Sequence, residues 1–211
     1  QLNNYMTLSE LGSIPFDISV LRSLYPNISS IHNKASDLER EKAIIRLKRG
    51  MYVVSPNVSG TLLSKELISN HLYGPSYVSM ETALRFYGLI PESVFTTKSL
   101  TIKQSRTFEN GLGKFQYINC SKEYFPVSIA QQTIKKATFI IAIPEKALCD
   151  MLIYTPNLNL RFQKEMLTYL EQDMRFDMEA FYKMDVSVFE QLSSVGRKRS
   201  LVNNIIKILN R

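Results

Sequence analysis

The hydrophobic repeat of the chain changes from a helical period to a strand period within its first quarter. Over about residues 7–42, apolar residues recur at helical spacing in three short segments. Over residues 45–54, apolar residues alternate with basic or polar ones around a tight turn at Arg49-Gly50. Three helices followed by a hairpin with a basic tip are typical of a winged helix-turn-helix. We therefore expect a DNA-binding domain of this kind over residues 1–57.

The second and third of these helices have clear start signals. Asp17 can cap the second helix, which Pro26 ends. Ser29 or Ser30 can cap the third, which we expect to run to about Lys42.

The hairpin supplies the first set of candidate DNA contacts. In a regular strand, Arg46 and Lys48 share one face, while Ile45 and Leu47 point the other way, into the helices. Arg49 lies at the turn, where Gly50 can adopt a positive φ. We expect Arg46, Lys48 and Arg49 to contact phosphates or the minor groove. The alternative is an ordinary solvated hairpin.

The third helix supplies the second set, because helix-turn-helix proteins contact bases from the front half of that helix. The candidate residues are Ser30, His32, Asn33 and Lys34, with Ser36 nearby. Asn33 can pair with adenine, and Lys34 with guanine or phosphate. Three acids follow and would repel phosphate, so that only the front half can approach DNA: Asp37, Glu39 and Glu41.

The net charge of +7 favours a polyanionic partner but is not concentrated in one tail. The excess of basic over acidic residues is +2 in residues 1–57, +3 in 58–157 and +2 in 158–211. A second local cluster, Arg197, Lys198 and Arg199, opens the last predicted helix. It can hold an anion or an acidic protein partner, or it can be a solvated turn.

Residues 58–211 predict a larger mixed α/β domain that ends in a helical subdomain. The fold class is therefore α/β (mixed α+β), with the winged helix-turn-helix at the N-terminus. The helices are expected at about residues 60–72, 79–87 (capped by Ser79), 145–154 and throughout 159–211. The strands are expected at residues 76–78, 93–103, 115–119 and 138–143, with a hairpin turn at 109–113.

Signals for an enzyme are weak. Walker, dinucleotide, G-x-S-x-G and H-E-x-x-H motifs are all absent from the sequence. Glu81, Glu145 and Asp150 with Lys146 could hold Mg²⁺ in a metal-dependent nuclease, but Glu145 and Asp150 are five residues apart and do not share a helix face. We expect Glu145 and Lys146 to form structural salt bridges instead, and we expect no catalytic residue, metal or cofactor.

The sequence predicts a cytoplasmic protein that is not embedded in a membrane. No apolar run approaches the roughly 20 residues of a membrane-spanning helix. No signal peptide is visible, although a chain that begins with Gln1 could have lost one. Cys120 and Cys149 are the only cysteines, which excludes a disulfide scaffold and suggests reduced thiols.

Four segments resemble the AbiEi family of type IV antitoxins and related transcriptional regulators. They are RLKRGMY at residues 46–52, HLYGPSYVSMETAL at 71–84, YGLIPE at 87–92 and IPEKALCD at 143–150. The last 55 or so residues carry no segment similar to the family.

The resemblance implies a winged helix that binds double-stranded DNA at the promoter of its own operon. It also implies a larger C-terminal domain and antagonism of a nucleotidyltransferase toxin without a stable complex. Dimeric or cooperative binding to repeated sites would compensate for the acids of the third helix. A stand-alone regulator without a toxin and a protein-interaction module that ignores DNA are the alternatives.

Overall fold

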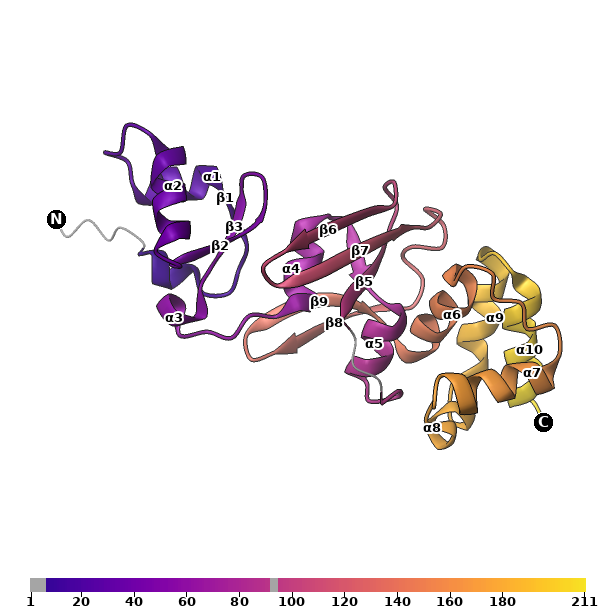
Figure 1. The fold of residues 1–211 in the computed structure, drawn as a ribbon. Coiled ribbons are helices and arrows are strands. Elements are labelled where there is room, and N and C mark those ends of the chain that lie inside the picture. Colours follow the sequence, from indigo (N-terminus) through magenta and orange to yellow (C-terminus); the bar gives the residue numbers. More distant parts are fainter. Residues whose placement is uncertain (1–6, 92–94) are drawn as a thin grey trace.

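The computed structural model describes residues 7–91 and 95–211. Over these residues the chain is a mixed α/β protein with ten α-helices and two β-sheets, as the sequence predicts. Its parts follow one another in a row: a small N-terminal part, a central six-stranded sheet and a group of C-terminal helices (Figure 1).

The N-terminal part contains short helices and a three-stranded antiparallel sheet in the order β1-β3-β2. Its elements are the 3₁₀ helix η1 (Leu8–Leu11), β1 (Phe16–Asp17), α1 (Ile18–Leu24), α2 (Ile31–Arg40), β2 (Ile44–Lys48), β3 (Met51–Val54) and α3 (Pro56–Ser59). Helix α2 ends two residues earlier than expected, since Lys42 adopts a left-handed φ of 58°. Strand β1 has only two residues, which is too short for any alternation in the sequence.

The apolar faces of α1 and α2 pack on one side of this small sheet. The buried residues of this core are Phe16, Leu21, Ile31, Ala35, Leu38, Ile44, Tyr52 and Val54. The helical spacing of the apolar residues in the sequence therefore identifies the buried faces of both helices correctly.

The central part is a six-stranded mixed sheet in the order β6-β7-β5-β4-β9-β8. Strand β4 is antiparallel to β5 and parallel to β9, and β5 is parallel to β7. Strands β6 and β8 form the two edges of the sheet, each antiparallel to its neighbour. The elements are α4 (Lys65–Leu72), β4 (Ser76–Val78), α5 (Met80–Phe86), β5 (Thr96–Thr101), β6 (Arg106–Asn110), β7 (Gly113–Asn119), β8 (Ile129–Ile134), β9 (Ala137–Ala142) and α6 (Pro144–Tyr154).

Helices α4 and α5 contact opposite faces of this sheet. Ser69 of α4 lies 2.8 Å from Ser99 of β5, measured between the hydroxyl oxygens. Glu81 of α5 forms an ion pair of 2.6 Å with Lys98, the neighbouring residue of the same strand. Because successive strand residues point to opposite faces, the two helices lie on different sides.

The C-terminal part is helical, as predicted, and packs against α6. Its elements are α7 (Gln163–Thr168), the π-helical segment η2 (Tyr169–Asp173), α8 (Met178–Tyr182), α9 (Val186–Val195) and α10 (Arg199–Leu209). Helix α10 buries an apolar stripe at helical spacing that includes Leu201, Ile205 and Ile208. No helix in residues 7–91 and 95–211 combines the length and apolar character that a bilayer span requires.

Three expectations for the central part need correction. Helix α4 begins at Lys65, where Ser64 caps it through the amide of Leu67 at 3.1 Å, and not near residue 60. Ser79 does not cap α5, because its hydroxyl donates to Asp150 instead. Edge strands β6 and β8 were not predicted, since their exposed and half-exposed residues carry no clear apolar alternation. Part of the predicted strand at residues 93–103 lies outside the described residues.

Candidate nucleic-acid interface

Two side chains cap α1 and α2 and so fix where each helix starts. Asp17 accepts from the amide of Ser19 at 2.8 Å, and Ser30 accepts from the amide of Asn33 at 3.4 Å. Such caps satisfy amides that have no partner within the helix. The Ser19 hydroxyl and the backbone amides that donate to Asp17 hold its pKa below the usual range. The predicted starts at Asp17 and Ser30 are both confirmed.

The front half of α2 presents a polar face to solvent. His32, Asn33 and Ser36 are exposed, whereas Ala35 is buried on the opposite face. Lys34 is half-buried, with its Nζ 4.9 Å from the centre of the Tyr25 ring. The exposed amide of Asn33 has the donor and acceptor pair that recognises an adenine edge.

Two of the three acids on the back half of α2 are neutralised within the N-terminal part. Asp37 pairs with Arg40, and Glu39 Oε1 accepts from Arg46 Nη2 at 2.6 Å. The hydrogen bond that Arg46 donates to Glu39 raises the pKa of Arg46. The Arg46 guanidinium lies 5.8 Å from the centre of the Tyr52 ring. Exposed pairs of this kind contribute at most about 1 kcal/mol, so a phosphate can compete for Arg46.

A β-bulge in β2 turns its two basic side chains to different sides of the hairpin. Arg46 lies opposite Tyr52, but Lys48 lies opposite Met51, so the register shifts between them. The Nζ of Lys48 donates to the backbone carbonyl of Leu72 at 2.6 Å, at the end of α4. The prediction that Arg46 and Lys48 share one face is therefore wrong.

One side of the hairpin packs on α1 and α2, and its other side packs on the central part. Leu47 and Val53 are buried there, with Ile45 and Met51 packed against the same cluster. The other buried members of this cluster are Ile68, Leu72, Phe115 and Tyr117. The expectation that Ile45 and Leu47 point into the N-terminal helices is wrong: Ile44 takes the inward position, whereas Ile45 and Leu47 share the other face and pack with the central part.

Arg49 is the basic residue of the hairpin that the structure leaves open to solvent. Gly50 has a φ of 76°, as the turn requires, and its carbonyl accepts from the amide of Ile18 at 3.1 Å. This bond ties the turn to the start of α1. In residues 7–91 and 95–211, no hydrogen bond or ion pair involves the Arg49 side chain.

The C-terminal basic cluster lies at the opposite end of the molecule from α2 (Figure 1). Lys198 donates to the carbonyl of Thr155 at 3.2 Å, and Arg199 donates to the carbonyl of Ser194 at 3.0 Å. These bonds join α9, α10 and the end of α6. Arg197, Lys198 and Arg199 are all exposed, and the structure does not bring them together with the predicted DNA-binding residues.

A buried polar cluster inside the central part was not predicted from the sequence. Asp150 is fully buried on α6 and accepts from the hydroxyls of Tyr77 at 3.0 Å, Ser79 at 2.6 Å and Tyr124 at 2.6 Å. Lys146 is also fully buried, one helical turn earlier, and donates to the Tyr124 carbonyl at 2.7 Å. The only sequence signal is the spacing of four residues between Lys146 and Asp150 in an apolar segment.

The pKa shifts in this cluster follow from burial. Burial raises the pKa of Asp150, against the opposing effect of the Lys146 ammonium and the three hydroxyls. Burial lowers the pKa of Lys146, and the Asp150 carboxylate opposes that shift. Both groups are buried, and the hydrogen bond from Tyr77 to Asp150 holds β4 and α6 together.

Burial, and secondarily the nearby Asp150 carboxylate, also raises the pKa of Cys120 to about 12. The thiol of the unfolded chain loses its proton near pH 9, whereas the folded protein keeps that proton to higher pH. Folding stability is therefore expected to fall as the pH rises above 9. Urea unfolding at pH 8 and pH 10 should show a smaller pH dependence for Cys120→Ala than for the wild type. An identical dependence in both proteins would contradict this assignment.

The acids weighed for a nuclease do not meet in one site. Glu81 pairs with Lys98, Glu145 accepts from the amide of Asp185 at 3.0 Å, and Asp150 is enclosed. The predicted salt bridges of Glu145 and Lys146 are likewise wrong, since Glu145 binds this amide and Lys146 binds a carbonyl. Among the described residues, no group of three or more His, Cys, Asp or Glu side chains is placed to hold a metal ion.

Comparison with known proteins assigns no family to the chain. No protein-family model matches the sequence, and no curated protein matches it.

Proposed function

We propose that the chain is a sequence-specific DNA-binding transcriptional regulator whose N-terminal part is a winged helix-turn-helix. The order of elements supports this proposal, since a short strand precedes the two helices and then pairs with the returning strand of the hairpin. The observation that carries the proposal is the Ser30-capped helix α2, whose front half exposes His32 and Asn33. In the proposed complex, this half enters the major groove and Arg49 contacts the backbone or the minor groove.

The first test is fluorescence anisotropy with the DNA upstream of the gene and with scrambled DNA, over a series of salt concentrations. We expect a preference of about 10³ or more for the upstream sequence. Equal binding to both DNAs with a steep salt dependence would show that the net charge of +7 attracts DNA without sequence preference. Absence of binding to either DNA would reject the proposal and favour a protein partner.

Two single substitutions separate base recognition from phosphate contact. Asn33→Ala is expected to cost about 1–3 kcal/mol on the upstream sequence only. Arg49→Ala is expected to weaken binding to both DNAs and to lower the salt slope by about one unit. Asn210→Ala and Arg211→Ala, at the far end of the chain, are the matched controls. If the salt slope of Arg49→Ala equals that of the wild type, the hairpin turn is not part of the interface.

The resemblance of residues 71–84 and 143–150 to AbiEi antitoxins extends the proposal. On this ground, the protein represses its own operon and opposes a nucleotidyltransferase toxin encoded nearby, without forming a stable complex with it. Co-expression with a neighbouring nucleotidyltransferase gene tests this extension. Restored growth supports an antitoxin, whereas growth arrest despite normal DNA binding supports a stand-alone regulator.

A further inference from the structure

Three cations gather on two aromatic rings where the hairpin meets the edge of the central sheet. The guanidinium of Arg106 lies 4.9 Å from the centre of the Phe108 ring and 6.0 Å from that of Tyr73. The Nζ of Lys103 lies 5.3 Å from the Tyr73 ring, and that of Lys48 lies 5.7 Å from the Phe108 ring. We call these three residues the edge cation cluster.

The protein does not neutralise this cluster with a carboxylate. Among the described parts of the chain, no ion pair involves Lys48, Lys103 or Arg106. Lys48 and Lys103 instead donate to the backbone carbonyls of Leu72 and Gly74, at 2.6 and 2.5 Å. Burial lowers the pKa of Lys48, and the positive charges of Arg106 and Lys103 lower it further. Like charges held this close repel one another, so an anion bound among them would be stabilised.

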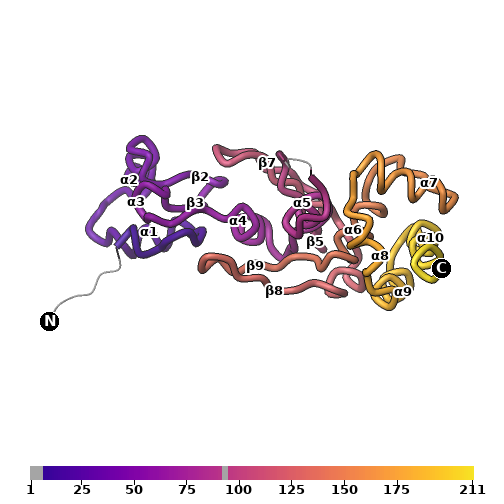
Figure 2. Tube along the Cα trace, turned by 90° about the horizontal axis from the view of Figure 1, so that it is seen from below, coloured from indigo at the N-terminus to yellow at the C-terminus, as the bar shows by residue number. Residues whose placement is uncertain are grey.

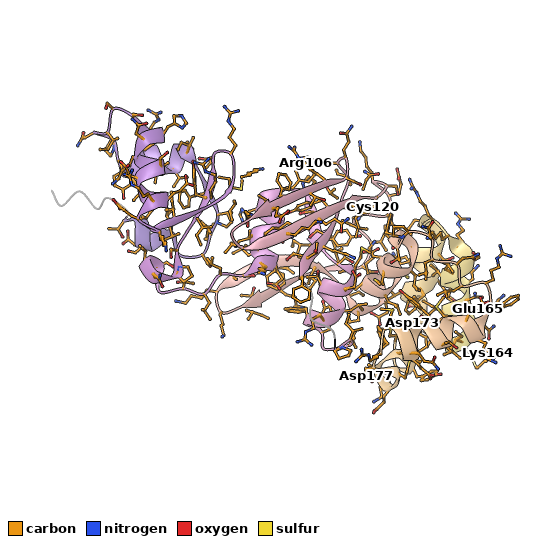
Figure 3. The ribbon with its side chains drawn as sticks, in the orientation of Figure 1. Arg106, Cys120, Lys164, Glu165, Asp173 and Asp177 are labelled. Atoms are coloured by element: carbon orange, nitrogen blue, oxygen red, sulfur yellow. The ribbon has the colours of Figure 1, made fainter. Side chains whose placement is uncertain are left out.

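The edge cation cluster includes Lys48, the residue before Arg49, and so adjoins the hairpin turn of the proposed DNA-binding surface. Along β2 and β6 the contacts run in opposite order: Asn110 donates to the Leu47 carbonyl at 3.0 Å, and the next hairpin residue, Lys48, lies over Phe108. Figure 2 shows α2, β2 and β7 one after another along the molecule, and Figure 3 shows Arg106 at the upper edge of the central sheet.

We infer that the edge cation cluster is a second contact site for the phosphate backbone of the DNA duplex that the N-terminal part binds. This inference rests on the proposed function and extends the interface from α2 and Arg49 onto the central sheet. A guanidinium stacked on an aromatic ring keeps its N–H edge free for bidentate contact with a phosphate. Since Arg106 and Lys103 are exposed, a duplex lying along this side can reach both.

The test removes two charges from the cluster and, separately, two from the opposite edge of the same sheet. The double variant Lys103→Gln/Arg106→Gln is expected to lower the slope of log K against log salt by about two units, because each phosphate contact contributes about 0.9 to that slope. Binding at 0.1 M salt should weaken about tenfold or more, equally on upstream and scrambled DNA. The matched control, Lys135→Gln with Lys136→Gln, lies in the turn between β8 and β9 and should leave the slope unchanged. Lys48 is kept because it contributes to the joint between hairpin and sheet.

Further measurements separate charge from folding. Arg106→Lys keeps the charge and should keep the salt slope, and thermal unfolding should be similar in all variants. The inference is overturned if the salt slope of the Lys103/Arg106 double variant is as steep as that of its control while Arg49→Ala still weakens binding. A loss confined to upstream DNA would also overturn it, because phosphate contacts are independent of sequence. If the wild-type protein shows no preference for upstream DNA, the proposed function itself fails.

Discussion

Replacing Asp150 by Ala is expected to lower the free energy of unfolding by about 3–5 kcal/mol. The substitution leaves the ammonium of Lys146 buried without a negative charge nearby, and it removes the acceptor of three hydroxyl groups. An uncompensated buried charge is among the costliest defects that a single substitution can create. Urea unfolding followed by circular dichroism measures the effect.

Asp173→Ala is the matched control for this substitution. Asp173 is exposed at the end of η2 (Figure 3), so its removal should change stability by no more than about 0.5 kcal/mol. Adding Lys146→Met to Asp150→Ala should restore part of the lost stability, because the unpaired charge is then gone. If the double variant is no more stable than Asp150→Ala alone, the cost does not arise from the charge of Lys146.

Leu47→Ala is expected to destabilise the protein by about 2–5 kcal/mol. Leu47 is only 2% exposed and fills the joint between the hairpin and the central sheet. Phe115 and Tyr117 belong to the same buried cluster and are held in the sheet, so they cannot move freely to fill the vacated space. Urea unfolding reports the loss, and faster hydrogen exchange of the β2 and β3 amides should accompany it.

Leu62→Ala makes the same chemical change at a side chain that is 70% exposed. It should alter stability by about 0.5 kcal/mol or less. Equal, small effects of Leu47→Ala and Leu62→Ala would show that the hairpin does not depend on the central sheet for its stability.

Local chemistry in the sequence predicts many starts and turns of this fold. The caps at Asp17 and Ser30, the Arg49-Gly50 turn and the proline that opens α6 all depend on neighbours within a few residues. The bulge in β2 has no such local signal. Strict alternation places Lys48 on the face of Arg46, whereas the register shift places it opposite Met51, and the side on which Leu47 is buried depends on residues far along the chain, such as Phe115.

The same distinction applies to the candidate interface. The exposed positions of Asn33 and Arg49 follow from helical and hairpin periodicity. The pair between Glu39 and Arg46 joins two elements of the N-terminal part, and the edge cation cluster joins the hairpin, the loop after β5 and an edge strand. Neither arrangement has a signal in the sequence, because each depends on tertiary contacts.

The joint between the hairpin and the sheet also affects the order in which the protein can fold during synthesis. The hairpin is complete once residue 54 has left the ribosome, but the β7 residues that cover its apolar side are made only at positions 113–119. During that interval, the emerging chain exposes Leu47 and Val53 on a short hairpin. Nascent chains that stall within this stretch are therefore expected to be prone to aggregation.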